Sequence, residues 1–188
     1  MTAGELTDGT DGTDGTDGTD GTEDVCRPPA DVPGSPPPPR STAQRVRDTR
    51  ELLRREIDCW VATTDPATGA PHLVPLSFDW DGSTMLLATA ERSVAGRGLA
   101  SGAGVRIGLG ATRDVVMVDG SVEVVPAATL EPAEGDRFAR RTGFGPRHSS
   151  GSYLFFRVVP SRIQAWREEN ELRGREVMLA GRWVVSEE

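Results

Sequence analysis

Lysine is absent from this sequence, because all 21 of its Lys and Arg residues are arginine. This absence excludes a lysine Schiff base and a lysine general base. Cysteine is scarce too: only Cys26 and Cys59 occur, which make neither a disulfide framework nor a metal motif. The sequence also lacks any apolar run near the ~20 residues of a membrane span, and it lacks the apolar part of a secretion signal. We therefore expect a cytoplasmic protein without a membrane partner.

Groups that carry acid–base catalysis are equally rare. The sequence holds two histidines, His72 and His148, and one tyrosine, Tyr153. It contains no H-x-x-x-H, C-x-x-C, G-x-S-x-G or phosphate-loop pattern, which excludes the common hydrolase and metal templates. A folded chain this poor in acid–base groups is expected to take its chemistry from a bound cofactor.

Residues 1–40 differ in composition from the rest. They contain seven of the fourteen prolines, five consecutive Thr-Asp-Gly units over residues 7–21, and a Pro-rich piece at residues 32–40. Such a segment buries too little apolar surface to offset its conformational entropy, so we predict a disordered tail. Nine acidic residues and two arginines give it a charge of −7, which leaves −1 for residues 41–188. This near-neutral domain gives no indication of nucleic-acid binding.

Short strand-like segments, separated by turns and by one short helix signal, follow one another over residues 58–126, which favours an antiparallel sheet or a small barrel. Val, Ile, Leu, Thr and Trp are frequent in them. The expected strands are residues 58–64, 72–80, 83–90, 105–110, 115–125, 153–159 and 161–166. The expected helices are residues 41–56, 93–102 and 131–142, whereas residues 167–183 stay ambiguous.

Several residues within these elements have a specific structural meaning. Pro75 indicates an edge strand or a bulge. Asp119-Gly120 is compatible with a hairpin turn or with a bulge in one long strand. Ser93 is a suitable N-cap for the helix at residues 93–102, but Gly96 and Gly98 weaken that helix, so packing must hold it.

Four segments carry a resemblance to a known family: TTDPATGAPHLVPLSFDWDG, TMLLATAERSVAGRGLASGAGVRIGLGA, DVVMVDGSVEVV and VVPSRIQAWREENELRGR. In order and spacing, residues 45–183 resemble the pyridoxamine 5′-phosphate oxidase-like family of flavin and deazaflavin split β-barrels. The resemblance implies a mainly β fold, a split β-barrel with a few peripheral helices, over residues 41–188. It also implies a homodimer with cofactor clefts between the subunits, and a single bent strand through Asp119-Gly120.

The resemblance further implies which residues bind the cofactor. They lie on the second strand, before and within the short helix, and after the last strands: His72, Val74, Leu76, Ser77, Thr89, Arg92, Ser93, Arg97, Trp166 and Arg175. Many family members have Arg and Lys where this chain has Val94 and Ala95, so Arg97 and Arg92 are the expected substitutes for phosphate binding. The alternative is that both arginines are solvated surface residues.

The function that this resemblance implies is hydride transfer between a bound coenzyme and a small-molecule substrate. FMN is the first choice of coenzyme, and a deazaflavin coenzyme (F-420) is the alternative. A different class is a non-catalytic protein that binds flavin, haem or another small ligand, which the loss of the usual phosphate-binding pair favours. A third is an interaction protein that acts through its acidic tail.

Overall fold

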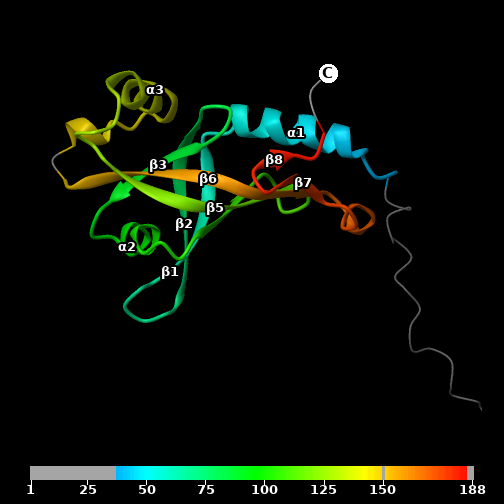
Figure 1. The fold of residues 1–188 in the computed structure, drawn as a ribbon, viewed down its shortest axis with the longest axis horizontal. Helices are drawn as coiled ribbons and strands as arrows, with labels where there is room; N and C mark the ends of the chain where they lie inside the picture. Colours follow the sequence, from blue (N-terminus) through cyan, green and yellow to red (C-terminus); the bar gives the residue numbers. More distant parts are fainter. Residues whose placement is uncertain (1–36, 150, 186–188) are drawn as a thin grey trace, which may run out of the picture. The chain divides into compact units, whose positions relative to one another are not determined.

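The computed structural model of the chain describes residues 37–149 and 151–185 (Figure 1). The predicted disorder of residues 1–40 therefore lies almost wholly outside the described residues. The described helices are α1 (Thr42–Arg55), α2 (Val94–Ala100) and α3 (Pro132–Thr142), with short 3-10 turns η1 (Pro146–His148) and η2 (Glu169–Glu171). None of these helices combines the length and the hydropathy that crossing a membrane requires.

Six antiparallel strands close into a barrel. They are β1 (Asp58–Thr64), β2 (Pro71–Trp80), β3 (Met85–Ala90), β4 (Val105–Leu109), β5 (Val115–Pro126) and β6 (Tyr153–Trp166). Their order is β3-β2-β1-β4-β5-β6, and β6 pairs back to β3. The strands β7 (Glu176–Leu179) and β8 (Arg182–Trp183) extend the sheet beyond the second half of β6. The predicted mainly β, split-barrel fold is confirmed.

Local signals set the ends of the helices as predicted. The Ser41 hydroxyl accepts from the Gln44 backbone N–H at the start of α1, and the Ser93 hydroxyl accepts from that of Gly96 at the start of α2. Gly143 ends α3 with a φ of 72°, a left-handed conformation that glycine adopts without strain. Pro75 lies on the part of β2 that pairs with β1 alone, which confirms the edge position.

Strands β5 and β6 are longer than local patterns indicate. The structure has one strand through Asp119-Gly120, as the family resemblance implies, and also one strand through Pro160, where two strands were expected. The second expectation is wrong because the pairing shifts from Asp119–Arg162 to Gly120–Pro160, which makes Ser161 an extra residue. A bulge of this kind tolerates a proline that cannot donate to a ladder. Gly120 also allows the close approach, since a Cβ there would lie 2.5 Å from the Val159 carbonyl oxygen.

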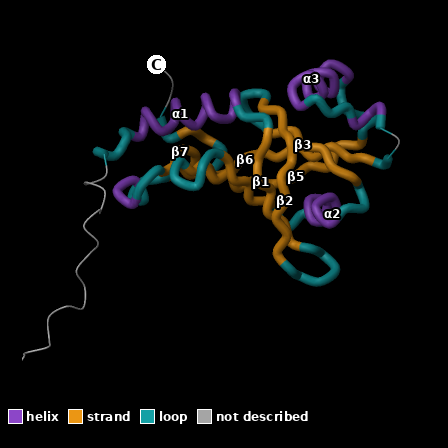
Figure 2. Tube along the Cα trace, turned by 180° about the vertical axis from the view of Figure 1, so that it is seen from behind, coloured by secondary structure: helices purple, strands orange, loops and turns teal. Residues whose placement is uncertain are grey.

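The barrel interior is the main core. Alternate residues of the strands fill it, among them Val61, Leu87, Ile107, Val118 and Phe156. A second cluster lies outside the barrel under α3, where Phe138 meets Phe155 edge-on with ring centroids 5.5 Å apart. Because both faces of the first half of β6 are buried, β6 is a central strand, as predicted. Figure 2 shows α1, α2 and α3 at separate places around the strands.

Candidate functional site

The barrel is split between β2 and β3. These neighbours pair only at residues 78–80 with 85–87, so residues 71–77 of β2 and 88–90 of β3 diverge. Helix α2 packs at this end of the barrel, where it contacts β1, β2, β3, β5 and β6. Its glycines permit the approach, since a Cβ on Gly98 would lie 2.8 Å from the Thr63 Oγ1 atom and 2.9 Å from the Thr64 carbonyl oxygen.

Ser93 and Thr89 stand together where β3 leads into α2. The Ser93 hydroxyl donates to the Ala90 carbonyl oxygen at 2.8 Å and accepts from the Gly96 N–H at 2.9 Å. The Thr89 Oγ1 atom lies 3.4 Å from the Ser93 Oγ atom. The Ser93 hydroxyl therefore stabilises the turn between β3 and α2 through two backbone hydrogen bonds.

Arg97 and His72 both lie near Asp65, which belongs to the turn between β1 and β2. Arg97 donates to the Arg92 carbonyl oxygen through Nη1, and its Nη2 atom lies 3.8 Å from the Asp65 Oδ1 atom. The pKa of the Asp65 carboxyl is lowered, first by the Ala67 backbone N–H and then by other groups that include Arg97 and His72. Arg92 is exposed at the start of the helix. The structure thus brings His72, Thr89, Arg92, Ser93 and Arg97 to one end of the barrel.

The four predicted contacts on β2 do not share a face. His72, Val74 and Leu76 pair with Thr63, Val61 and Cys59, whose side chains are buried, so they point toward the barrel interior. Ser77 points outward and donates to Asp58 Oδ1 at 2.6 Å. The first three side chains therefore share the inner face, where Leu76 packs against the main core, and the Ser77 hydroxyl lies on the opposite face.

Trp166 and Arg175 form a separate pair. The Arg175 guanidinium lies over the Trp166 ring, 5.4 Å from its centroid. Trp166 ends β6, whereas Tyr153, at the start of β6, pairs with Ala90 beside the split. Among the described residues, no hydrogen bond or ion pair joins Trp166 or Arg175 to Arg92 or Arg97, so the pair and the two arginines form separate groups within one subunit.

A hollow on the outside of the barrel was not predicted from the sequence. It has a cavity volume of about 480 Å³ and spans β1, β4, β5 and the end of β6. Trp60 (53% exposed) and Leu73 (59% exposed) stand at one side of it, and Met117 and Trp166 also line it. Alternation along β1 could have placed Trp60 outside, opposite Cys59 and Val61, but local sequence does not identify its neighbours on other strands.

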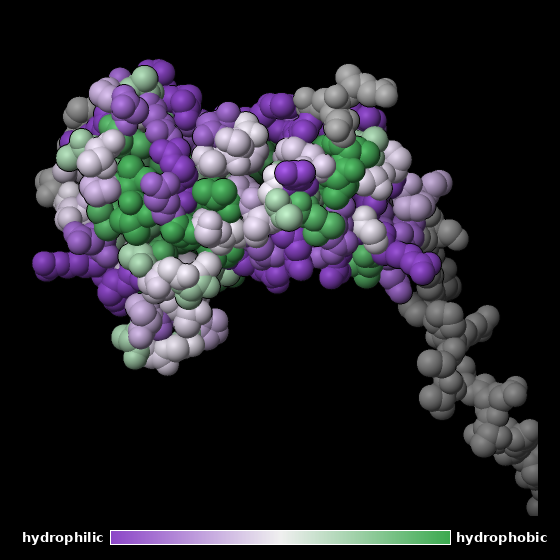
Figure 3. Space-filling model, in the orientation of Figure 1, coloured by the Kyte–Doolittle hydropathy of each residue, from purple (hydrophilic) through white to green (hydrophobic). Residues whose placement is uncertain are grey.

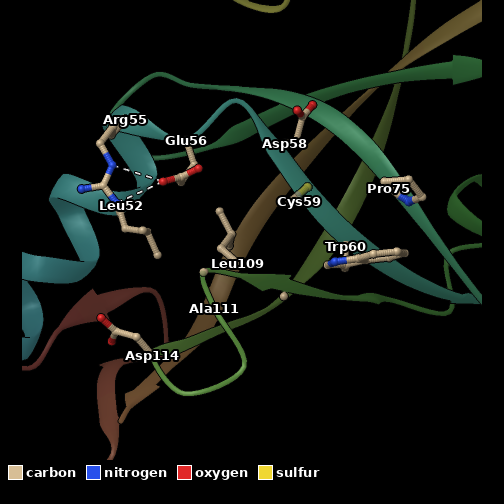
Figure 4. A pocket seen from close by; sticks show the side chains of 12 residues that line it. Leu52, Arg55, Glu56, Asp58, Cys59, Trp60, Pro75, Leu109, Ala111 and Asp114 are labelled. Carbon is tan, nitrogen blue, oxygen red and sulfur yellow. Dashed lines mark hydrogen bonds and ion pairs between the residues drawn. The ribbon is translucent and has the colours of Figure 1, made fainter.

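A second hollow of about 440 Å³ adjoins the first and shares five lining residues with it: Trp60, Gly108, Leu109, Gly110 and Ala111. Figure 4 shows Trp60 and Pro75 side by side at one end and the Arg55–Glu56 pair at the other. Cys59 lines this hollow, but burial raises the pKa of its thiol to about 12, which keeps it protonated and unreactive. The cysteine is therefore a small core residue, as expected for a strand position.

Comparisons with known proteins agree with this architecture. The family model described as pyridoxamine 5′-phosphate oxidase matches residues 47–167. The chain belongs to this family. No curated protein sequence matches it.

Solved structures share the fold of this oxidase family member at low sequence identity. An F420 reductase aligns with a TM-score of 0.51 and 21% identity, over 61% of this chain and 94% of that one. A protein of unknown function from Agrobacterium tumefaciens aligns with a TM-score of 0.58 and 19% identity, over 77% and 62%. An FAD-binding protein from Mesorhizobium loti aligns with a TM-score of 0.51 and 16% identity, over 62% and 88%.

Proposed function

We propose that this member of the pyridoxamine 5′-phosphate oxidase family is a flavin-type oxidoreductase that transfers a hydride between a bound coenzyme and a small molecule. The observation that carries the proposal is the split beside α2, within the segment that matches the family. Two arginines flank this opening, and half-buried side chains of β2 line it. The near absence of acid–base side chains in the chain agrees with chemistry supplied by a coenzyme.

The residues at the split suit a phosphate-bearing coenzyme. Arg97 and Arg92 can give charge-assisted hydrogen bonds to the phosphate, and the Thr89 hydroxyl is a further donor. Because Val94 and Ala95 have no polar side-chain atom, phosphate binding would depend on the guanidiniums of Arg92 and Arg97. Asp65 near Arg97 keeps that guanidinium oriented but weakens the local positive field.

Val74 and Leu76 are half-buried at the opening and would hold the coenzyme ring and limit the access of water. When bound, the coenzyme supplies the hydride acceptor and donor, while the chain orients the substrate beside it. FMN is the first coenzyme that we propose, and the deazaflavin coenzyme (F-420) is the second, with the similarity to an F420 reductase in its support. We expect the protein to act in the cytoplasm.

We further propose a homodimer with sites shared between subunits. Within one subunit, Trp166 and Arg175 form a group separate from Arg92 and Arg97. A coenzyme that contacts all four residues would take the pair at the end of β6 from a second copy. A two-fold arrangement makes two such sites at once.

A non-catalytic binder of flavin, haem or another small ligand is the second candidate function. The observation that favours it is the apolar pair Val94 and Ala95 at the start of α2. A binder needs affinity but no substrate position, so it tolerates a weaker and simpler site.

Visible absorption and fluorescence spectra of the purified full-length protein test these proposals. A yellow protein, or FMN uptake that enhances thermal stability, supports the FMN oxidoreductase. A colourless protein that takes up only the deazaflavin supports the second coenzyme. Uptake of either coenzyme without turnover of a reductant supports the non-catalytic binding protein. If the protein takes up neither coenzyme, the proposed flavin-type function is contradicted.

A further inference from the structure

The loop between Trp166 and Arg175 has almost no apolar surface to bury. Its residues 167–174 read REENELRG, and the single apolar side chain, Leu172, is 40% exposed. Figure 3 shows hydrophilic surface at the right-hand end of the domain, where this loop lies. The Ala165 backbone N–H donates to the Arg175 carbonyl oxygen at 2.9 Å and closes the base of the loop. Because hydrophobic packing cannot fix the rest, polar contacts must hold it in place.

Glu171 is the one buried residue of this loop, and it makes most of those contacts. Its side chain accepts from the Arg167 backbone N–H at 2.8 Å, which ties the loop to itself. It also accepts from the backbone N–H, Nε and Nη2 atoms of Arg40 at 2.7–3.0 Å. The Glu171 backbone carbonyl accepts from Arg45 Nη1 at 3.1 Å. The loop after β6 is therefore fastened to α1 and to the residues that precede α1.

Arg40 connects the loop to further elements. Its Nη1 atom lies 2.9 Å from Asp48 Oδ2 on α1 and 3.5 Å from Asp114 Oδ1 before β5. The Asn170 Nδ2 atom donates to the Pro37 carbonyl oxygen at 2.8 Å, so two adjacent loop residues hold the segment before α1. Figures 1 and 2 show the start of α1 and this loop at the same end of the barrel. Removing one partner of such a buried ion pair leaves the other charge uncompensated and releases the loop.

We propose that Arg40 and Glu171 are positioning residues, which hold Trp166 and Arg175 in place for the coenzyme. Trp166 and Arg175 flank the loop that the Arg40–Glu171 pair fixes, and the Arg175 guanidinium lies over the Trp166 ring. A half-site that is ordered before the ligand arrives has a lower entropy cost of binding. This role rests on the proposed function, because it concerns the half of the coenzyme site that a second copy would supply.

Fluorescence titration of the full-length protein with FMN tests the role. Arg40→Ala should weaken FMN binding about tenfold, and Arg40→Lys should weaken it less, because it keeps the charge without the forked geometry. Glu171→Gln changes the net charge in the opposite direction. It should nevertheless weaken FMN binding too, which separates positioning from a long-range charge effect. Arg140→Gln removes an exposed charge on α3 and should leave the affinity unchanged.

Two further comparisons separate positioning from a general loss of stability. Phe138→Leu leaves a cavity in the separate core cluster under α3, so it should lower the melting temperature but not the FMN affinity. Without any coenzyme, the amides of residues 167–175 should exchange their hydrogens faster in Arg40→Ala but not in Phe138→Leu. In a double-mutant cycle, Arg40→Ala should weaken FMN binding little further once Trp166→Ala is present, because Arg40 acts through Trp166.

The outcomes distinguish this role from the proposed function. If the wild type binds FMN and Arg40→Ala binds it equally well, the positioning role is overturned and the coenzyme site stands. Unchanged hydrogen exchange over residues 167–175, or fully additive effects of Arg40→Ala and Trp166→Ala, overturns it as well. A wild-type protein that binds neither FMN nor the deazaflavin contradicts the proposed function, and the positioning role falls with it. If Arg40→Ala does not fold, Arg40→Lys takes its place in every comparison.

Discussion

At the residue scale, glycine decides how closely α2 approaches β1. Ordinarily a glycine inside a helix costs about 1 kcal/mol relative to alanine, so replacement should stabilise α2. Gly98 is different, because a Cβ there would lie 2.8–2.9 Å from atoms of Thr63 and Thr64. Two of the three close atoms belong to backbone or to a Cβ, so they cannot move away easily. Overpacking of this kind costs about 1–3 kcal/mol and should outweigh the gain in propensity.

We therefore expect Gly98→Ala to lower the free energy of unfolding by about 1–2 kcal/mol, measured by urea denaturation. Gly108→Ala is the matched control, since its Cβ would meet only ordinary contacts at 3.5 Å or more. That control should be neutral within about 0.5 kcal/mol. A Gly98→Ala protein as stable as the wild type would show that α2 can shift away from β1.

Arg97 carries the second residue-scale prediction. It lies one helical turn after Ser93, and the apolar Val94 and Ala95 leave Arg92 as its nearest charged neighbour along the chain. Arg97→Ala should weaken FMN binding about ten- to a hundredfold, because a charged hydrogen bond to phosphate contributes about 1.5–3 kcal/mol. Riboflavin, which lacks the phosphate, should bind both proteins almost equally. Fluorescence titration with the two ligands measures this difference.

The exposed Arg140 again supplies the control, since Arg140→Ala removes the same charge far along the sequence from α2. Equal FMN affinity in Arg97→Ala and the wild type would remove Arg97 from the coenzyme site. Its bonds to the Arg92 carbonyl and to Asp65 would then be its whole role.

At the element scale, prediction from sequence succeeds where a few neighbouring residues decide the outcome. Ser41, Ser93 and Gly143 define helix ends through hydrogen bonds and dihedral angles within one turn, so their effect is local. Pro160 shows the limit. Its own chemistry indicates a strand end, but the Ser161 bulge and the pairing with β5 carry β6 through it.

The candidate site follows the same division. The residues around α2 could be named from one continuous stretch and its family resemblance. The hollow around Trp60 could not, because it depends on the register of β1, β4 and β5, which are distant in sequence. The four residues predicted on β2 fall on two faces for a related reason. Ser77 points outward because the alternation of side chains continues without a bulge after Leu76.

The segment before α1 is tied to the η2 turn through Glu171. Arg40 donates to this buried carboxylate through its backbone N–H, Nε and Nη2 atoms at 2.7–3.0 Å. Chiefly for this reason the pKa of Glu171 falls from about 4.5 to about 2. A pKa lowered by folding stabilises the protein above the unfolded value, and this contribution is lost as the pH falls from about 4.5 towards about 2.

Glu171→Gln should therefore lower the free energy of unfolding at pH 7 by about 1–3 kcal/mol. The difference from the wild type should shrink as unfolding is measured at progressively lower pH. Glu169→Gln, an exposed neighbour in the same turn, should have no such effect. A Glu171→Gln difference that stays constant down to pH 2 would mean that the charge of Glu171 does not contribute.

At the scale of the whole molecule, the boundary of the folded part can be tested by truncation. Sequence composition predicts that residues 1–40 are dispensable for stability, but Arg40 is bonded to Glu171 and to Asp48. Removing residues 1–36 should leave the melting temperature unchanged, whereas removing residues 1–40 should lower it by several degrees, on the order of 1–2 kcal/mol. Arg40→Ala in the full-length chain should reproduce the larger effect. Identical melts of the two truncations would show that the Arg40 contacts add nothing.

Assembly is the last property to test, because the coenzyme proposal needs a second copy. The Trp166–Arg175 pair and the Arg92–Arg97 pair form separate groups within one subunit, so we expect a neighbouring subunit to complete a site that uses both. We expect light scattering to return the mass of a homodimer at micromolar concentration.

Arg97→Ala and Trp166→Ala should each weaken FMN binding in isolation. Mixing and re-associating the two variants should restore tight binding at about a quarter of the sites, because half of the dimers are then mixed and each holds one intact site. Wild-type subunits carried through the same procedure control for losses on re-association. A monomer mass, or two variants that never complement each other, would contradict the shared site while leaving the split barrel itself unchanged.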